Sequence, residues 1–233
     1  MADDWLFDQL DKTKDTNLSE ITIRRLPRYF RYFRELSEQG RLRISSTALS
    51  KMMNVSASQI RSDLNQLGDF GNSGYGYDVN YLFHKIAEIL GVKEGIRAVI
   101  IDSGDLGRAL VQTTLFVRRG VEVMALFDGI GDRVGTSVSG IPILPLARLE
   151  DFMDTHVVDI AILTCPKDQA QVISQRVTDR GIRGIWNYTG RELHPEGHPD
   201  VIIENVHLGD SLMILNYKLK KQAHRNGRRK TDV

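Results

Sequence analysis

The sequence predicts an α/β protein: a winged helix-turn-helix unit, then a Rossmann-like doubly wound parallel sheet, then a C-terminal dimerisation helix. Three patterns lead to this prediction. Two short helical patterns follow one another, each beginning after a serine. An apolar strand runs into a glycine-containing turn and a helix, as at the start of a βαβ unit. Beyond this unit, short apolar strands alternate with helices, as in a parallel sheet covered on both faces.

Composition and charge limit the possible functions. The chain has 233 residues, 41% of them hydrophobic, and a net charge of +1, so we expect a packed globular protein whose total charge indicates no partner. The single cysteine fits a reducing compartment. The acidic start does not resemble a signal peptide, and no apolar run approaches the ~18 residues of a membrane span. We therefore expect a cytoplasmic protein with no membrane partner.

Changes in pattern predict the domain boundaries. These are a flexible acidic lead-in at 1–18, the winged-helix unit at 19–91, the sheet unit at 92–206, the C-terminal helix at 207–222 and a basic tail at 223–233.

A basic helix opens the winged-helix unit. Thr22 is a candidate N-cap, and apolar residues recur after it at helical spacing until Gly40. Between Ile21 and Arg61 the chain carries nine Lys or Arg against two acids, an excess of seven positive charges. In a nearly neutral chain, such an excess indicates contact with a phosphate backbone. The alternative is a solvated helix face without a partner.

A helix-turn-helix pattern follows. Ser46 is placed to cap a helix over Thr47–Met53, and Ser56 to cap a second one over Ala57–Leu67. The Gly- and Tyr-rich stretch Asp69–Val79 is typical of a hairpin wing. These patterns predict binding to double-stranded DNA, with the second helix in the major groove. The predicted DNA-binding residues are Arg24, Arg28, Ser45, Ser46, Lys51, Ser58, Gln59, Arg61, Ser62, Asn65, Gly74 and Tyr75.

The βαβ unit predicts a dinucleotide site. Its parts are the strand Ala98–Ile101, the turn Asp102–Gly107, a helix expected to reach Val117, and the strand Val121–Phe127, which is followed directly by Asp128. Glycines in the turn would let the backbone approach a pyrophosphate, and the terminal acid would accept hydrogen bonds from ribose hydroxyls. The predicted cofactor-binding residues are Asp102, Ser103, Gly104, Asp105, Leu106, Gly107 and Asp128.

Two carboxylates disturb this pattern. Asp102 stands where the fingerprint has its first glycine, and Asp105 adds a second acid. Both would repel a pyrophosphate unless something offsets them. A Rossmann-like unit that binds no dinucleotide is therefore an alternative.

The rest of the chain completes the sheet. The expected strands are Ile141–Leu144, Ile160–Leu163, Ile182–Trp186 and Val201–Glu204, and the expected helices are Leu146–Thr155, Asp168–Arg180 and His207–Lys221. The last helix carries a stripe of leucines, Leu208, Leu212, Leu215 and Leu219. This stripe must be buried, and a partner subunit is a candidate for covering it.

No catalytic or metal-binding constellation emerges. The histidines lack zinc-ligand spacing, and His194 and His198 in a Pro-rich loop indicate a metal only weakly. Cys165 follows a strand near the expected ligand cleft, where a buried inert thiol is favoured over a redox-reactive one. We expect neither an enzyme nor a resident metal.

Short segments spread over the chain match a known family. They are RLPRYFRYF (Arg25–Phe33), RISS (Arg43–Ser46), IRSDL (Ile60–Leu64), GYGYDVNYL (Gly74–Leu82), GDLGRAL (Gly104–Leu110), FD (Phe127-Asp128), GIPI (Gly140–Ile143), AILTCP (Ala161–Pro166), GIWNY (Gly184–Tyr188) and ENVHL (Glu204–Leu208). From about Thr22 to Lys220 the chain resembles the Rex family of redox-sensing transcriptional repressors. The resemblance implies NAD(H) as the ligand and homodimers that exchange their C-terminal helices. Such dimers bind operator DNA when NADH is scarce and release it when NADH binds.

The chain departs from the family pattern at several positions. The family has Gly-x-Gly-Asn-Leu-Gly where this chain has Asp102-Ser103-Gly104-Asp105-Leu106-Gly107. It has a Tyr and an Asp, a pair that helps couple the nicotinamide to dimer closure, where this chain has Thr113 and His207. It has two adjacent basic residues where this chain has Arg61 and Ser62.

The sequence therefore predicts a dimeric DNA-binding transcriptional repressor that responds to the NADH/NAD redox state. One alternative is a paralogue that binds DNA but has lost or altered NADH sensing. Another is an NAD-dependent oxidoreductase, but the chain lacks a placed proton donor and a separate substrate domain. Because of Asp102, Asp105, Thr113 and His207, we expect weaker NADH binding than is typical of the family.

Overall fold

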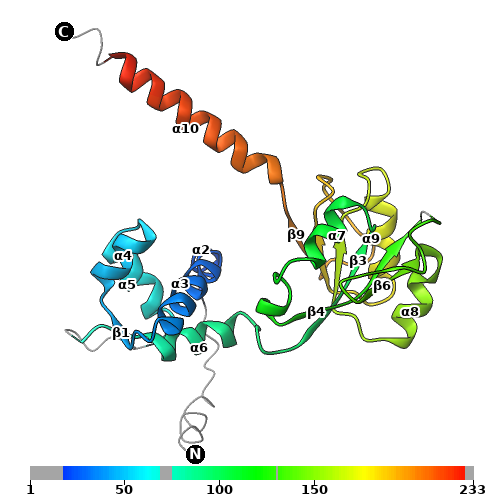
Figure 1. Cartoon of the computed structure of the whole chain (residues 1–233), viewed down its shortest axis with the longest axis horizontal. Helices are drawn as coiled ribbons and strands as arrows, with labels where there is room; N and C mark the ends of the chain where they lie inside the picture. Colours follow the sequence, from blue (N-terminus) through cyan, green and yellow to red (C-terminus); the bar gives the residue numbers. More distant parts are fainter. Residues whose placement is uncertain (1–17, 69–74, 130, 229–233) are drawn as a thin grey trace, which may run out of the picture. The chain divides into compact units, whose positions relative to one another are not determined.

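A computed structural model describes residues 18–68, 75–129 and 131–228, with side chains as far as residue 223 (Figure 1). The predicted lead-in, except for Leu18, and the last residues of the predicted tail lie outside this part of the chain. The chain divides into two compact units, Met1–Lys93 and Glu94–Val233. We call them the N-terminal unit and the sheet unit.

The N-terminal unit is a small helical domain with a two-stranded sheet. Its elements are α2 (Glu20–Ile23), α3 (Leu26–Glu38), β1 (Arg43–Ile44), α4 (Ser46–Met53), α5 (Ala57–Asn65), β2 (Tyr77–Asp78) and α6 (Val79–Ile89). One apolar core joins the helices, with Leu26, Tyr29, Phe33, Leu49, Ile60, Leu64, Leu82 and Ile86 among its members. Phe30 of α3 also stacks on Phe83 of α6, with ring centroids 5.3 Å apart.

The first predicted helix begins earlier and is broken in two. Ser19, not Thr22, is the N-cap: its side chain accepts a hydrogen bond from the Thr22 N–H, and Thr22 itself is buried. The chain then turns and starts again as α3, with Pro27 in the first turn. Pro27 has no N–H to donate to the Ile23 carbonyl, so a continuous helix would lose a hydrogen bond here, which favours the break.

The predicted helix pair is present in α4 and α5. Ser45, one residue before the predicted Ser46, caps α4, and Ser56 caps α5. Asn54 ends α4 in the left-handed conformation, with φ 51°, which turns the chain sharply into α5. Asn tolerates this conformation better than most residues, so its place in the turn has a physical reason.

One strand of the predicted wing lies within the described residues. This strand, β2, runs antiparallel to β1, with Ile44 opposite Tyr77. Gly76 has a φ of +73°, and a methyl group there would lie 2.8 Å from the Ile44 carbonyl oxygen. The close approach of the two strands therefore requires glycine. The tip of the wing, including Gly74, lies outside the described residues.

Within the described residues, the sheet unit is built on seven strands in the order β5-β6-β4-β3-β7-β8-β9. They are β3 (Ile96–Ile101), β4 (Val121–Asp128), β5 (Ser137–Val138), β6 (Ile141–Pro145), β7 (Ile160–Leu163), β8 (Gly184–Asn187) and β9 (Ile202–Asn205). Neighbours are parallel except the edge strand β5, which was not predicted and pairs antiparallel with β6. The predicted doubly wound sheet is confirmed. Its strand order reverses between β3 and β7, the switch point at which such sheets bind ligands.

Helices cover both faces of the sheet (Figure 1). One face carries α7 (Asp105–Val111) and the 3-10 turn η1 (Val117–Arg119); the other carries η2 (Leu146–Arg148), α8 (Leu149–Thr155) and α9 (Ala170–Thr178). Alternate residues of β3 enter different cores, Ala98 and Ile100 on the α7 side and Val99 and Ile101 on the α8–α9 side.

The helix after the glycine turn is shorter than predicted. It ends at Val111, whereas the apolar periodicity extended to Val117. Thr113 gives the reason, because its hydroxyl donates to the Leu110 carbonyl at 2.7 Å and accepts from the Leu115 N–H at 3.2 Å. These side-chain bonds take the place of the helical bonds of the next turn.

The C-terminal helix, α10 (Leu208–Arg228), is longer than predicted. It passes residue 222 and enters the stretch predicted as a tail, through Lys, Gln and Ala residues that favour helix. Its apolar side chains Leu208, Leu212, Met213, Ile214, Leu215, Tyr217 and Leu219 are all exposed. An apolar face of this extent is typical of an interface. None of the described helices combines the length and apolar character needed to cross a membrane.

Candidate functional site

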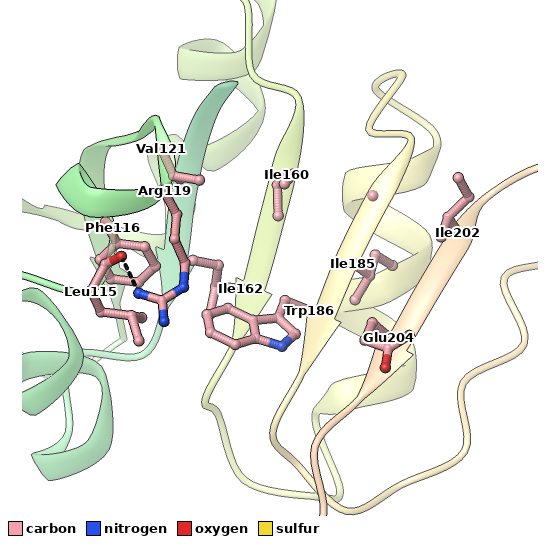
Figure 2. Close-up of a pocket in the computed structure, with 11 residues that line it drawn as sticks. Leu115, Phe116, Arg119, Val121, Ile160, Ile162, Ile185, Trp186, Ile202 and Glu204 are labelled. Atoms are coloured by element: carbon pink, nitrogen blue, oxygen red, sulfur yellow. Dashed lines mark hydrogen bonds between the residues drawn. The ribbon is translucent and has the colours of Figure 1, made fainter. Parts of the chain in front are cut away.

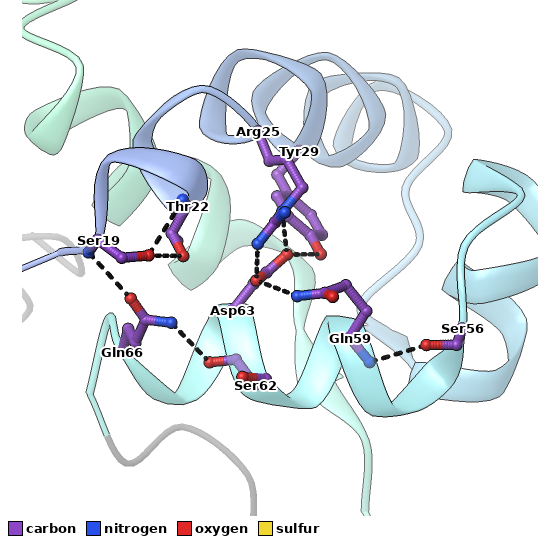
Figure 3. A network of polar contacts seen from close by, with 9 residues as sticks. All are labelled: Ser19, Thr22, Arg25, Tyr29, Ser56, Gln59, Ser62, Asp63 and Gln66. Carbon is purple, nitrogen blue, oxygen red and sulfur yellow. Dashed lines mark hydrogen bonds and ion pairs between the residues drawn. The ribbon is translucent and has the colours of Figure 1, made fainter.

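A buried carboxylate connects α5 to the start of α3 (Figure 3). Asp63 of α5 is completely buried. Arg25, the residue before α3, donates to its two oxygens through Nε and Nη2 at 2.7 and 2.6 Å. The Tyr29 hydroxyl donates at 2.9 Å, and Gln59 Nε2 donates at 2.7 Å. We call these four residues the Asp63 cluster.

The Asp63 cluster fixes the orientation of α5. Burial, together with the hydrogen bond to Asp63, raises the pKa of Tyr29 far above its ordinary value, so its hydroxyl stays a donor. Gln59 was predicted to face DNA, but its amide is directed at Asp63 instead. Asp63 was not among the predicted site residues, because a lone acid on an amphipathic helix gives no sign of partners 34 or 38 residues away.

The outer face of α5 carries the other predicted contacts. Ser58, Arg61, Ser62 and Asn65 are all exposed. Arg61 Nη1 donates to the Ser46 hydroxyl of α4 at 3.2 Å. A guanidinium has five N–H donors, so this bond still leaves Arg61 able to reach a base edge.

Two predicted phosphate contacts have different surroundings. Arg24 is exposed and pairs with Glu20 at 2.9 Å across the surface. Arg28 is half-buried; its Nη2 donates to the Met53 carbonyl at the end of α4, and its guanidinium lies 5.9 Å from the centroid of the Tyr32 ring. Arg28 therefore stabilises the end of α4, where cations interact favourably with free carbonyls.

The remaining predicted contacts lie around the helix pair. Lys51 and Tyr75 are exposed, whereas the Ser45 hydroxyl is engaged in capping α4. Arg31 and Arg43, which were not among the predicted contacts, are also exposed cations of this unit.

In the sheet unit, the turn from β3 to α7 lies at the switch point. Thr164, which follows β7, donates its hydroxyl to the Ile101 and Asp102 carbonyls at 2.9 and 3.1 Å and so ties the turn to the next strand. A methyl group at Gly107 would collide with the Asp102 carbonyl oxygen and lie 3.1 Å from Thr164 Oγ1. Glycine is therefore required for the close packing of α7, as predicted. Leu106 is half-buried in the first turn of α7.

The Asp102 side chain lies over the turn. Its Oδ2 would be 2.7 Å from a methyl group at Gly104, so the carboxylate lies close to the backbone of that residue. Burial and the neighbouring Asp128 raise the pKa of Asp102, against the smaller opposing effects of the Gly104 N–H and of Arg133.

The other two acids differ from what the sequence suggested. Asp128 is buried and accepts hydrogen bonds from the Ser103 N–H, at 3.2 Å, and from the Ser103 hydroxyl, with Arg133 Nη1 3.7 Å away. It thus holds the start of the turn in place. The Asp105 side chain is 98% exposed and pairs with Arg108 at 2.8 Å, so its charge is directed toward solvent.

Comparisons with known proteins agree with this division into two units. Residues 17–65 match a family model described as the N-terminus of a putative DNA-binding protein. Residues 93–190 match a second model, described as a CoA binding domain.

Whole-chain relatives decide the family. The redox-sensing transcriptional repressor Rex of Caldicellulosiruptor bescii is 43% identical over 209 residues, which cover 90% of this chain and 95% of that protein. The chain belongs to the Rex family. A crystal structure of RSP, a Rex-family repressor, in complex with beta-NAD+ and operator DNA is 40% identical, with a TM-score of 0.82 over 91% of this chain and 97% of that one. RSP in complex with beta-NADH is 38% identical, with a TM-score of 0.82 over 91% and 98%.

In this Rex-family member, the backbone of the turn after β3 fits a dinucleotide, but the Asp102 side chain does not fully do so. Gly104 and Gly107 provide the close approach that a pyrophosphate needs. The carboxylate of Asp102, however, already lies close to Gly104. The residues therefore fit NAD(H) when Asp102 is displaced or neutral.

Other departures from the Rex pattern lie outside the turn. Thr113 is exposed after the end of α7, and His207 is exposed before α10. Burial raises the pKa of Cys165 to about 12, so its thiol stays protonated at neutral pH. Of the two loop histidines, His198 pairs with Asp179 at 2.8 Å. Among the described residues, no three His, Cys, Asp or Glu side chains gather where they could hold a metal ion.

The Asp63 cluster should contribute to the stability of the N-terminal unit. Asp63→Asn replaces an acceptor oxygen with an amide donor facing Arg25 and leaves that cation without its counter-charge. We expect the free energy of unfolding of the N-terminal unit to fall by about 2–4 kcal/mol in urea titrations. Glu20→Gln, which removes a carboxylate from the exposed Arg24 pair, should cost less than about 1 kcal/mol. Equal losses of unfolding free energy in the two variants would show that the Asp63 cluster stabilises the unit no more than an exposed ion pair does.

Proposed function

We propose that this chain is a dimeric repressor of transcription whose N-terminal unit binds operator DNA and whose sheet unit binds NAD(H) and controls that binding. The main support is the combination, in one Rex-family chain, of a rigidly held helix pair and a glycine turn at a sheet switch point. RSP, solved with both operator DNA and NAD+, is similar over nearly the whole chain. Acting on operator DNA would place the protein in the cytoplasm, as a regulator rather than an enzyme.

In this proposal α5 is the recognition helix. The Asp63 cluster holds its inner side, so Ser58, Arg61 and Asn65 are left for base edges in the major groove. Ser62 and the exposed Lys51 would contact phosphates. Arg24 could join them by exchanging its weak surface pair with Glu20 for a phosphate, whereas Arg28 would support α4 without contacting DNA.

In the sheet unit, NAD(H) would lie with its pyrophosphate over Gly104 and its adenosine near Asp128. The bound cofactor supplies the redox signal through the state of its nicotinamide. One specific observation favours a second candidate function: the Asp102 carboxylate occupies part of this position. The second candidate is a Rex paralogue that binds operator DNA but no longer responds to NADH.

The dimer would form through α10. Its exposed apolar side chains include Leu212, Leu215 and Leu219, and each contributes ~1.5–3 kcal/mol when fully buried. The sheet offers a second uncovered apolar surface, a cavity of about 260 Å³ on the α7 side of β7, β8 and β9 (Figure 2). Phe116 and Trp186 line it edge to face, with centroids 6.2 Å apart. A second copy would cover both surfaces.

Operator binding and its release test the function directly. The labelled operator of a Rex-family relative should bind the purified protein in fluorescence anisotropy titrations. NAD+ should leave the complex intact, and NADH should dissociate it, at higher concentrations than RSP requires in a parallel titration. Binding that NADH does not affect would favour the paralogue, and a failure to bind any operator DNA would contradict the proposal.

Arg61→Ala tests the placement of α5. We expect operator binding to weaken by about 1–3 kcal/mol, and discrimination against mutated operators to fall, because a bidentate base contact is lost. Arg34→Ala is the matched control: it removes the same charge from the same unit, but Arg34 lies against Glu38, 3.8 Å away. Equal losses in the two variants would mean that Arg61 acts only through its charge.

Truncation before His207 tests the dimer. Without α10 the protein should run as a monomer, or aggregate, in light scattering, because the sheet surface loses its cover while the leucine stripe is gone. A truncated protein that remains a stable dimer would contradict the assignment of α10.

A further inference from the structure

Asp102 has a backbone conformation that most side chains avoid. Its φ is +84°, in the left-handed region, where glycine is free of strain and Asn or Asp is tolerated with some cost. It follows directly after β3, at the switch point of the sheet. An aspartate at this position therefore carries a conformational cost that a glycine would not.

The carboxylate of Asp102 lies where the fold places phosphate. Gly104 precedes α7 and has no side chain with which to cap it. Asp102 approaches so closely that its Oδ2 would lie 2.7 Å from a methyl group at Gly104, which places the carboxylate beside the Gly104 backbone N–H. In Rossmann-like units this backbone N–H and the space above the glycine serve the pyrophosphate of the ligand.

We propose that the Asp102 carboxylate is an internal substitute for the pyrophosphate, so that dinucleotide binding takes up one proton at Asp102 when the phosphates replace it. This inference rests on the proposed binding of NAD(H) by the sheet unit. It makes Asp102 the residue that sets dinucleotide affinity and makes that affinity depend on pH.

The charged groups around Asp102 favour this exchange. The charge of Asp128, at the end of β4, acts on Asp102, and Asp128 already accepts a hydrogen bond from Ser103, while Arg133 of the following loop is a cation that acts on both acids. Cys165, after β7, feels the Asp102 charge and keeps its proton. Burial and Asp128 also raise the pKa of Asp102, so it is the acid of this group that is ready to accept a proton.

Asp105 does not share this role. It follows Gly104 in the first turn of α7, but its side chain is 98% exposed and pairs with Arg108 on the same helix. Solvent screens its charge, so its removal should change dinucleotide binding much less than the removal of Asp102. Asp105 therefore supplies a control that removes the same charge three residues further along the turn.

The direction of the pH effect follows from linkage. The pyrophosphate favours neutral Asp102, so binding raises the pKa of this group further and takes up a proton. As pH falls toward the pKa of Asp102 in the free protein, affinity should rise by at most about tenfold per pH unit, and it should level off below that pKa.

Calorimetry of the full-length protein with NAD+ tests the proposal. Titrations at about pH 6 and about pH 8, in buffers of different ionisation enthalpy, give both Kd and the number of protons taken up. The wild type should take up a proton at the higher pH and bind more tightly at the lower one. Asp102→Asn keeps the shape of the side chain without its charge, and Asp102→Gly also removes the backbone cost. Both should bind NAD+ about tenfold or more tightly than wild type at the higher pH, with no proton uptake.

The outcomes separate this inference from the proposed function. Asp105→Asn should take up a proton as the wild type does. Tight wild-type binding without proton uptake, or a pH dependence that Asp102→Asn retains, would overturn the role of Asp102 and leave NAD(H) binding in place. If melting curves show that the wild type and Asp102→Gly are folded, and neither protein binds NAD+ or NADH, the role of Asp102 and the proposed NAD(H) binding are both overturned.

Discussion

A buried carboxylate must be surrounded by hydrogen-bond donors, and both units of this chain depend on that constraint. In the N-terminal unit, Asp63 accepts from Arg25, Tyr29 and Gln59, and every one of these bonds joins α5 to α3 or to itself. In the sheet unit, Asp128 accepts from the backbone and hydroxyl of Ser103 and so fixes the turn after β3. Each aspartate holds in place the segment that we propose to meet the ligand.

The consequences differ between the two units. Asp63 has donors for both of its oxygens, which fixes the inner side of α5 and leaves its outer face exposed. Burial and the charge of Asp128 disfavour the ionised form of Asp102 and raise its pKa, and the Gly104 N–H and Arg133 offset them only in part. The protonation state of Asp102 would therefore change when an anion binds beside it or when the pH falls. The same physical rule thus fixes α5 in one unit, and in the other it leaves Asp102 as the acid that we propose to give way to phosphate.

Much of the fold could be predicted because periodicity and turn chemistry are local. The serines before α4 and α5, the apolar strands and the glycines of the turn each act on neighbours within a few residues. The breaks in regular structure were harder to predict. Thr113 ends α7 through its own side-chain bonds, and Pro27 divides the first helix, although the apolar pattern continues through both.

The site residues show the same limit. Gln59 and Arg28 look like surface groups in the sequence, yet one donates to Asp63 and the other to the Met53 carbonyl, contacts that only the folded chain brings together. Asp105 and Asp102 look alike beside the glycines, but one side chain points into solvent and the other over Gly104. The spacing of residues in the sequence shows only which acids lie near a turn. Their direction depends on the left-handed backbone at Asp102 and on the cation available to Asp105 on α7.

The central claim is that the carboxylate of Asp102 and the phosphates of a dinucleotide compete for one place. The most direct measurement is the side-chain carboxyl carbon-13 chemical shift of Asp102, assigned with Asp102→Asn and followed through a pH titration with and without NAD+. The account predicts a pKa above the ordinary aspartate value in the free protein and a further rise when NAD+ is bound. A pKa at or below the ordinary value, unchanged by saturating NAD+, would contradict it.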